Sequence, residues 1–449
     1  MCYKTNNHIK HNVMIRFLQI SDIHFKDKDG NDDEYLQMKS KFIDDIELCQ
    51  RSKGKIDYVL ICGDIAFSGL DREYKVAREF IGSICDKAKC DQVFLVPGNH
   101  DKKWSVYQRM RQAMRDYLLK GKSLKLLFES KVYEPMAVGT LYTPFKQYYK
   151  LAEEKLCISD VASKALVFPE SEQKGEVAEF VSIDKMYWTQ DLGEIKGFHL
   201  YIHGSNTSLL SDRDDGDSRT LEKEKHLQVL PLQCYNIEAK SDEIHILMLH
   251  HPMSEIYEGK KIETDIDSRF KLQFYGHVHK QSSAVDGAIK IYSGALQPEE
   301  EEINEYFPVY NVIELDVVKL EGKPVLKVDV FCRKWNRTEF VEFKGETKTG
   351  ANALTIDLTK NDSWERTVSS TGITNDKTDF ALPEMHINPF DVKTRFIRCG
   401  RERTIIKKMY GDTFDKITSN RTKYLYFLKQ VDVDGRIIEL DEILKKYDK

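Results

Sequence analysis

The chain has 449 residues, more than a single compact core usually holds, so we expect one large domain and one smaller domain. Its formal net charge of -5 excludes an overall attraction to nucleic acids or anionic membranes, so any binding of a polyanion must be local. Its nine cysteines are dispersed without a CxxC pair, and the polar tail at residues 1–13 precedes no apolar run of membrane length. Both features predict a cytoplasmic protein.

The first hundred residues alternate short apolar runs with helical patterns, which is typical of βαβ units. Strands are predicted at residues 14–20 (MIRFLQI), 58–63 (YVLICG) and 92–98 (QVFLVPG). Residues 34–51 and 71–89 carry apolar side chains at helical spacing among charged ones, so each is predicted to be a helix that leads to the next strand. We therefore expect a sheet covered by helices.

The middle of the chain is predicted to contain a helical insertion and then further strands. Residues 102–160 are rich in helix-forming and basic residues and are predicted to be the insertion. Residues 211–220 (SDRDDGDSRT) have no apolar side chain and are predicted to be a solvated loop. The further strands are predicted at 176–183, 197–210, 243–252, 271–279, 288–296, 308–317 and 324–331.

Changes of composition divide the chain into domains. A polar stretch rich in Thr, Asn, Gly and Lys begins near residue 344, and new apolar periodicity begins near residue 380. We therefore predict a main domain at residues 14–343, a linker at 344–379 and a small C-terminal α+β domain at 380–449.

Polar residues follow three successive strands of the predicted sheet. They are Asp22 and His24 after the first strand, Asp64 after the second, and Asn99 and His100 after the third. Because ligands of α/β proteins bind beyond the carboxyl ends of the strands, we expect these side chains to lie together. A lone Asp-x-His triplet is more often a turn acid beside a surface histidine, but three strand ends with such residues favour one shared site.

Histidines also follow two of the later strands. His250 and His251 end the run ILMLHHP, and His277 and His279 end the run LQFYGHVH. Asp, Asn and His suit borderline or hard divalent cations, of which we favour Mn²⁺, with Fe or Zn²⁺ as alternatives. Any single histidine is more simply a core or turn residue, but the whole set contains enough ligands for two ions.

The motifs DxH, GDxxxxG, GNHD, HH and GHxH stand in this order within residues 14–316, and the set resembles the calcineurin-like metallophosphoesterase superfamily. The resemblance implies a four-layer αββα sandwich, in which two mixed β-sheets are flanked by helices. It also implies a phosphoric ester hydrolase in which two divalent metal ions activate water for attack on phosphorus.

The resemblance further implies roles for individual residues. The ligands of one ion would be Asp22, His24, Asp64 and His279, and those of the other would be Asp64, Asn99, His250 and His277. Asp64 would then bridge both ions. His100 would be the catalytic residue that stabilises the transition state or protonates the leaving oxygen, and His251 would lie beside the ligands.

One position departs from the phosphoprotein phosphatase branch of the family, whose second motif is GDxxDRG with an acid that orients the catalytic histidine. Here the motif is GDIAFSG, with Phe67 where that acid would lie, and Asp101 is the alternative acid. Activity on phosphoproteins is therefore disfavoured. The form fits better with the branches that cleave phosphodiesters, which include cyclic nucleotide phosphodiesterases and SbcD-like nucleases.

Other residues bear on the substrate. The bases that follow Asp101 in the insertion could steer a polyanion, or could simply solvate helix faces. The basic run 393–408 (KTRFIRCGRERTIIKK) fits nucleic-acid binding, docking of a protein partner or an ordinary solvated face, whereas the acidic run 298–305 opposes wide contact with a polyanion. His203, Asn206 and His251 are candidates for substrate contacts.

Two hypotheses of different classes remain. The first is a phosphodiesterase that acts alone, with DNA or RNA slightly favoured over cyclic or small nucleotides because the insertion and the extra domain exceed what a small nucleotide requires. The second is a catalytic subunit that works mainly in a larger complex and docks through residues 380–449 to a partner such as an ATPase. A homodimer is compatible with both, and no membrane partner is expected.

Overall fold

The computed structural model describes residues 10–11, 14–26, 33–106, 108, 111–112, 115, 141–155, 187–211, 228–230, 237, 239–298, 307–344, 346–347, 353–359, 402–411, 427, 431 and 437–444. The chain divides into two compact units. The first comprises Met1–Phe128 and Met136–Val368, and the second comprises Glu129–Pro135 and Ser369–Lys449. No helix among the described residues is long and apolar enough to cross a membrane.

A seven-stranded mixed sheet contains the N-terminal βαβ units. Its order is β13-β12-β11-β2-β3-β4, with β15 paired to β12. The parallel strands are β2 (Ile15–Ile20), β3 (Tyr58–Cys62) and β4 (Val93–Val96), and they are connected by α1 (Asp33–Lys53) and α2 (Asp71–Ala88). The antiparallel strands are β11 (Val309–Leu320), β12 (Lys323–Trp335), β13 (Phe340–Phe343) and β15 (Ala353–Asp357).

An eight-stranded mixed sheet forms the other half of the first unit, in the order β1-β5-β6-β7-β8-β10-β9-β14. Its strands are β1 (Lys10–His11), β5 (Tyr187–Ile195), β6 (Phe198–Ser205), β7 (Glu243–Met248), β8 (Phe270–Tyr275), β9 (Ser282–Asp286), β10 (Ala288–Tyr292) and β14 (Glu346–Thr347). Four of them, β6, β7, β8 and β10, run parallel to one another. The short helix η6 (Met253–Glu255) and α7 (Gly259–Arg269) connect β7 to β8.

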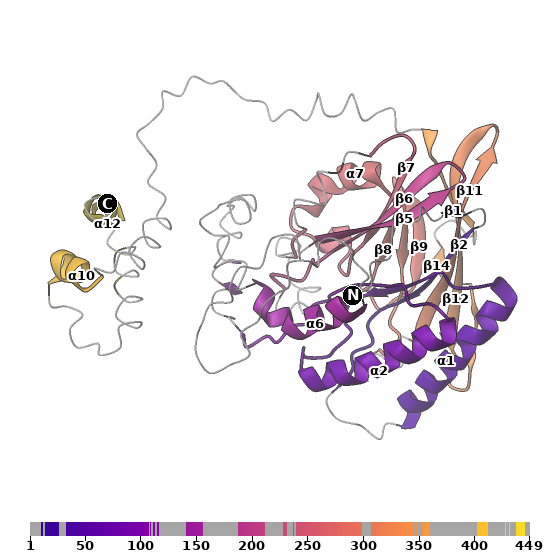
Figure 1. Cartoon of the computed structure of the whole chain (residues 1–449), viewed down its shortest axis with the longest axis horizontal. Helices are drawn as coiled ribbons and strands as arrows, with labels where there is room; N and C mark the ends of the chain where they lie inside the picture. Colours follow the sequence, from indigo (N-terminus) through magenta and orange to yellow (C-terminus); the bar gives the residue numbers. More distant parts are fainter. Residues whose placement is uncertain are drawn as a thin grey trace. The chain divides into compact units, whose positions relative to one another are not determined.

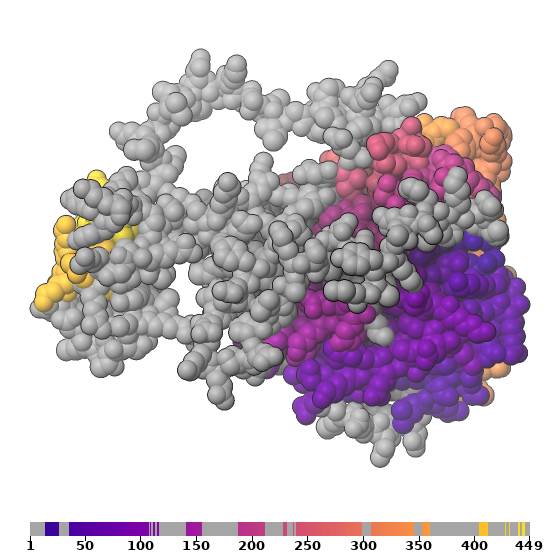
Figure 2. All heavy atoms as spheres, in the orientation of Figure 1, coloured from indigo at the N-terminus to yellow at the C-terminus, as the bar shows by residue number. Residues whose placement is uncertain are grey.

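The two sheets pack face to face around one apolar core. Phe17 of β2 contacts Phe274 of β8 with ring centroids 5.8 Å apart, and the Trp188 indole of β5 donates a 3.2 Å hydrogen bond to the Leu95 carbonyl of β4. Helices α1 and α2 lie along one side of this unit and α7 lies on another (Figure 1). On the face drawn in Figure 2, residues of α1 and α2 form much of the described surface. The predicted fold of two mixed sheets with flanking helices is confirmed.

Several local predictions need correction or fall outside the described residues. The predicted linker is wrong at its start, because β14 pairs with β9 and β15 pairs with β12. The polar composition concealed a short alternating strand, in which Leu354 is buried in the core. In the insertion, η1 (Thr143–Phe145) and α6 (Lys146–Lys155) are helical, whereas residues 116–140 lie outside the described residues. The predicted strand 176–183 and nearly all of the loop 211–220 also lie outside them.

The second unit has its own small core. Its described helices are α10 (Glu402–Tyr410) and α12 (Ile437–Leu444). Ile405 and Met409 of α10 are buried with Leu440 and Leu444 of α12, and Phe427 lies in the same cluster. Described elements of this unit are helical, so the strands of the predicted α+β domain stay a prediction. Most of the basic run 393–408 lies outside the described residues.

We predict that Gly204→Ala destabilises the first unit. A Cβ at Gly204 of β6 would overlap the indole ring of Trp188, which is itself packed against Phe94 with ring centroids 5.6 Å apart. Overpacking of this kind costs about 1–3 kcal/mol. Thermal unfolding should show a melting temperature lower by about 3 °C or more. Gly82→Ala is the matched control, because a Cβ at Gly82 of α2 meets no atom within 4 Å and alanine favours a helix. Equal stability of the two variants would contradict the packing described.

Candidate metal centre

The residues that follow β2, β3 and β4 lie together with residues that follow β7 and β8. Four overlapping groups have ligand atoms within 4.8 Å of one another, namely Asp22, His24 and His279; Asp22, Asp64 and His250; His24, Asp64 and His100; and His250, His251 and His277. Six of the seven predicted ligands belong to these groups. The seventh, Asn99, lies beside them with its Oδ1 3.1 Å from His250 Nε2. The two sheets therefore contribute to one cluster.

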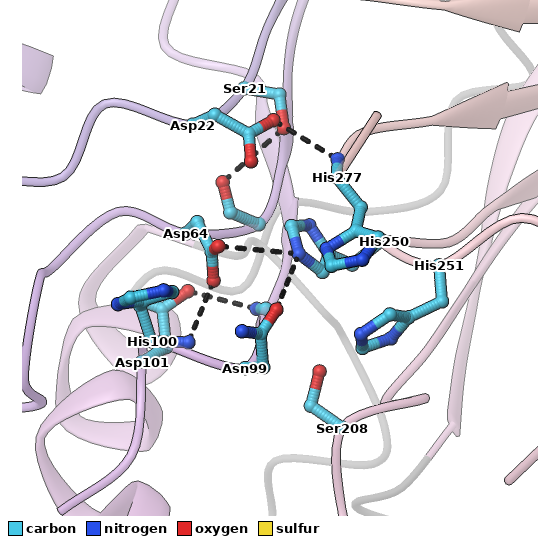
Figure 3. Close-up of polar contacts among 12 residues, drawn as sticks. Ser21, Asp22, Asp64, Asn99, His100, Asp101, Ser208, His250, His251 and His277 are labelled. Atoms are coloured by element: carbon cyan, nitrogen blue, oxygen red, sulfur yellow. Dashed lines mark hydrogen bonds and ion pairs between the residues drawn. The ribbon is translucent and has the colours of Figure 1, made fainter. Parts of the chain in front are cut away.

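Asp64 is the residue that connects this cluster (Figure 3). Its Oδ2 lies 3.2 Å from His24 Nε2 and 3.4 Å from His250 Nε2. Its Oδ1 accepts a 2.8 Å hydrogen bond from the backbone N–H of His100. One carboxylate at the end of β3 therefore joins the loops that follow β2, β4 and β7.

Asp22 makes the corresponding link between the two sheets. Its Oδ2 accepts a 3.1 Å hydrogen bond from the backbone N–H of His277, and its Oδ1 lies 3.2 Å from His279 Nε2. Because Asp22 follows β2 and the two histidines follow β8, this carboxylate holds a loop of one sheet against a loop of the other.

The backbone around the cluster is strained. Among the described residues, ten other than glycine have a positive φ, and half of these are the predicted ligands Asp22, His24, Asp64, His277 and His279, with φ between 50° and 65°. This conformation costs a residue with a side chain about 1–2 kcal/mol. Such strain gathers at functional sites, where the surrounding structure holds a few side chains in a required geometry.

Glycines allow the loops of the site to approach one another closely. A Cβ at Gly98 would overlap Asp64 Oδ1, and a Cβ at Gly276 would overlap the Ser21 hydroxyl and the Cys62 carbonyl. The close approach of these loops therefore requires glycine in the motifs GNHD and GHxH, because no larger side chain fits between them.

Backbone carbonyls orient two of the imidazoles. His250 Nδ1 lies 2.8 Å from the Cys62 carbonyl oxygen, and His100 Nδ1 lies 2.9 Å from the Phe67 carbonyl oxygen. A carbonyl only accepts, so Nδ1 carries the hydrogen in each neutral ring and donates it. When the ring is neutral, Nε2 of His250 presents its lone pair to the cluster, which is the usual arrangement of a metal-binding histidine.

Asp101 does not replace the acid that is missing at position 67. Its carboxylate accepts hydrogen bonds from the backbone N–H groups of Ile65, Ala66 and Gly98, at 2.8–3.1 Å, and from the Tyr74 hydroxyl at 2.7 Å. It therefore fastens the loop after β3 to the loop after β4. The orientation of His100 comes from the main chain of Phe67 itself.

The charges of the cluster depend on one another. Burial opposes ionisation of Asp22, but the adjacent His279 outweighs it and lowers the pKa of Asp22 to about 2. Burial also opposes protonation of His250, yet the charge of Asp64 raises the pKa of His250 to about 9. For Asp101, burial and the charge of Asp64 both act in the same direction and raise the pKa to about 6.

The donor atoms fit divalent cations. Asp22 and Asp64 are two buried carboxylates that lie close together, and such a pair requires positive charge beside it. His24 Nδ1 and His251 Nε2 are buried nitrogens that lack a hydrogen-bond partner. Carboxylate, amide and imidazole donors at this spacing suit Mn²⁺, Fe or Zn²⁺.

Three supporting residues were not found from the sequence. The Thr207 Oγ1 lies 2.8 Å from His251 Nδ1, and Glu255 Oε2 lies 2.9 Å from His277 Nε2. The third is Lys102, the first of the bases that follow Asp101, which is fully buried and therefore cannot steer a polyanion. Its Nζ donates to the carbonyl of Ser208, so it fastens the loop that carries Thr207. A hydroxyl, a carboxylate and a lysine outside the motifs have no sequence signature of their own.

Two predicted substrate contacts have partners elsewhere. His203 Nε2 lies 2.8 Å from His245 Nδ1, and its Nδ1 contacts the hydroxyls of Tyr187 and Thr189. The Asn206 amide donates to the Tyr149 hydroxyl at 3.1 Å. These bonds belong to the folded framework, so substrate contacts by His203 and Asn206 stay predictions.

We predict that Gly98→Ala weakens metal binding, because the added methyl group would displace the Asp64 carboxylate. Disturbance of the groups that support a ligand typically lowers metal affinity about 10–100-fold. Titration with Mn²⁺, followed by calorimetry, measures the change. Gly82→Ala serves as the control, and unchanged affinity in Gly98→Ala would show that Asp64 is not a ligand held in this position.

Comparisons with known proteins place the chain in a family. A family model of the calcineurin-like phosphoesterases matches residues 15–281. An uncharacterised metallophosphoesterase-like protein of Bacillus subtilis (strain 168), YydB, is 25% identical over 308 residues, and the match covers 66% of this chain and 56% of that protein. A solved structure of a purple acid phosphatase from yellow lupin (Lupinus luteus) seeds matches with a TM-score of 0.38 and 13% identity, over 77% of this chain and 54% of the lupin chain. Because the family model spans more than half of the chain, the chain belongs to the calcineurin-like phosphoesterase family.

Proposed function

We propose that this chain hydrolyses phosphodiesters at a centre of two divalent metal ions. The observation that carries the proposal is the position of Asp64 Oδ2, which lies within 3.4 Å of a histidine from each of the two predicted ligand sets. One ion is assigned to Asp22, His24, Asp64 and His279, and the other to Asp64, Asn99, His250 and His277. Mn²⁺ is the favoured metal.

The chain's own residues contribute position and proton transfer. When bound, the ions polarise the phosphoryl group and activate water. Asp64 fixes the spacing of the two ligand sets, and the backbone bond from His100 to Asp64 places the imidazole beside them. Because His100 Nδ1 donates to the Phe67 carbonyl, Nε2 is the ring atom that can give a proton to the leaving oxygen; it does so from the imidazolium form, which becomes the neutral ring.

The surroundings of His100 favour diesters over phosphoproteins. The Phe67 carbonyl orients His100, so the side chain at position 67 need not be an acid. A diester carries a second organic substituent on its phosphorus. The partly exposed ring of Phe67 can contact such a substituent, whereas an acid at position 67 would contact it less favourably. Among diesters, nucleic acid is slightly favoured, and cyclic or small nucleotides are the alternative.

A second hypothesis concerns the setting in which the site works. The second unit has its own buried core, which suits a module that docks to a protein partner. In that case the protein is a catalytic subunit of a larger complex, with residues 380–449 as the contact. A cytoplasmic location and a homodimer are further parts of this proposal, and size-exclusion chromatography with light scattering tests the dimer.

A substrate panel tests the proposed function. With Mn²⁺ present, the purified chain should hydrolyse bis-p-nitrophenyl phosphate faster than p-nitrophenyl phosphate, and it should cleave either DNA or a cyclic nucleotide. Asp64→Ala is the blank, because it removes the shared carboxylate. A fully metal-loaded protein that turns over none of the diesters would refute the stand-alone enzyme, and activity restored only by cell extract would favour the catalytic subunit.

Replacement of His100 tests its separate role. We expect His100→Gln to lower kcat for bis-p-nitrophenyl phosphate about 10²–10⁴-fold, the usual contribution of a general acid. Its metal content, measured by elemental analysis, should equal that of the wild type. His199→Gln is the control, because His199 is a partly exposed histidine of β6 that pairs with Asp191. Loss of metal in His100→Gln would instead make His100 a ligand, as its place in the group with His24 and Asp64 allows.

A further inference from the structure

Two aromatic side chains flank His100. The ring of Phe67 lies 5.3 Å from the imidazole, and the ring of Trp104 lies 5.5 Å from it, measured between centroids. Phe67 also contacts His24 edge-on, with centroids 6.3 Å apart. Both aromatic side chains are partly exposed, unlike the buried ligands beside them. Phe67 and Trp104 therefore form an aromatic rim of the site, which borders both the proposed catalytic histidine and the predicted ligand His24.

The main chain holds these rings in place. The Trp104 indole N–H donates a 3.1 Å hydrogen bond to the carbonyl of Asn99, and the backbone N–H of Phe67 donates a 3.0 Å bond to the carbonyl of Phe25. Asn99 is itself a predicted ligand, and Phe25 follows the predicted ligand His24 in the sequence. The Trp104 ring and the main chain of Phe67 are therefore held close to the predicted ligands, which limits the conformational entropy lost when a planar group stacks on the two rings.

A cation accompanies the rings. The Lys26 Nζ lies over the Phe67 ring, 5.1 Å from its centroid, and the Lys26 side chain is exposed. An aromatic surface with a nearby exposed cation is the combination by which proteins bind single-stranded nucleic acids, through stacking on the base and attraction to the backbone. An alkyl ester or a phosphorylated side chain of a protein would gain less than a nucleic acid from the aromatic rings and from the lysine.

We propose that Phe67 and Trp104 form a stacking site for the nucleobase of the leaving nucleoside, so that the substrate is a diester between nucleosides. This inference rests on the proposed phosphodiesterase function and goes beyond it by naming the substrate class and the side on which the base lies. The leaving side follows from His100, because this residue gives its proton to the leaving oxygen and the two rings flank its imidazole.

A set of dinucleotides tests the inference. The substrates are thymidylyl-thymidine and two analogues in which one nucleoside or the other is replaced by an abasic deoxyribose analogue. The released alcohol, identified by chromatography, shows which nucleoside leaves. We expect loss of the base from the leaving nucleoside to lower kcat/KM about tenfold, a factor that corresponds to ~1.4 kcal/mol and lies within the range of base–aromatic stacking. Loss of the other base should have a smaller effect.

Variants then assign the effect to the rim. Phe67→Leu should reduce the difference between the intact dinucleotide and the analogue without the leaving base. Phe331→Leu is the matched control, because Phe331 of β12 is also partly exposed and also has a lysine over its ring, with Lys53 Nζ 3.6 Å from the centroid. The control should keep the full difference. Equal rates for the intact and abasic substrates, or a difference that persists in Phe67→Leu, would overturn the inference.

Failure of the inference can be told from failure of the proposed function. Bis-p-nitrophenyl phosphate carries no nucleobase, so its hydrolysis tests the diesterase activity alone. If wild type hydrolyses this diester but not the dinucleotide, the stacking site is refuted and the phosphodiesterase function stands. If the metal-loaded protein hydrolyses neither, the proposed function is refuted and this inference falls with it.

Discussion

The buried carboxylate of Asp64 is the interaction on which the arrangement of the site depends. A buried charge is costly unless it is paired, so the fold must bring His24, His250 and the N–H of His100 to this one group. These partners come from loops after three different strands. The need to satisfy Asp64 therefore determines how close the ends of β2, β4 and β7 lie, and the spacing of the remaining ligands follows.

This closeness requires support from residues that never touch a substrate. The left-handed backbone at the ligands is unfavourable in isolation, and it persists because the loops are hydrogen-bonded to one another. Asp101 joins the loops after β3 and β4, and Asp22 joins the two sheets through His277. Both linking carboxylates are fully buried. The strain is thus offset by a rigid framework, which holds the donor atoms before any cation binds.

The sequence predicts those parts of the molecule that have a local signature. The strands β2, β3 and β4 are short runs of mainly apolar residues, and the predicted ligands stand in ordered motifs at strand ends. In contrast, β5 contains polar residues and a bulge between Asp191 and Gly193, and β15 lies in a polar stretch, so neither has a clear apolar pattern. The sequence also could not predict the hydrogen bond from His100 to the Phe67 carbonyl, because every residue has a carbonyl and only the backbone conformation decides where it points.

The presence of phenylalanine at position 67, where the phosphoprotein phosphatases have an acid, has two consequences, and the second follows from the first. Because the main-chain carbonyl of Phe67 orients His100, the proposed catalytic residue, the side chain of Phe67 does not have this task and can contribute to substrate binding. Here the side chain is an aromatic ring beside His100, with an exposed lysine over it. The predicted metal ligands would specify the bond that is broken, since any phosphoric ester presents the same phosphoryl oxygens to bound ions. On the proposed function, discrimination among esters then comes from Phe67 and Trp104, and Phe67 contributes both to the orientation of His100, through its carbonyl, and to the choice of substrate, through its ring.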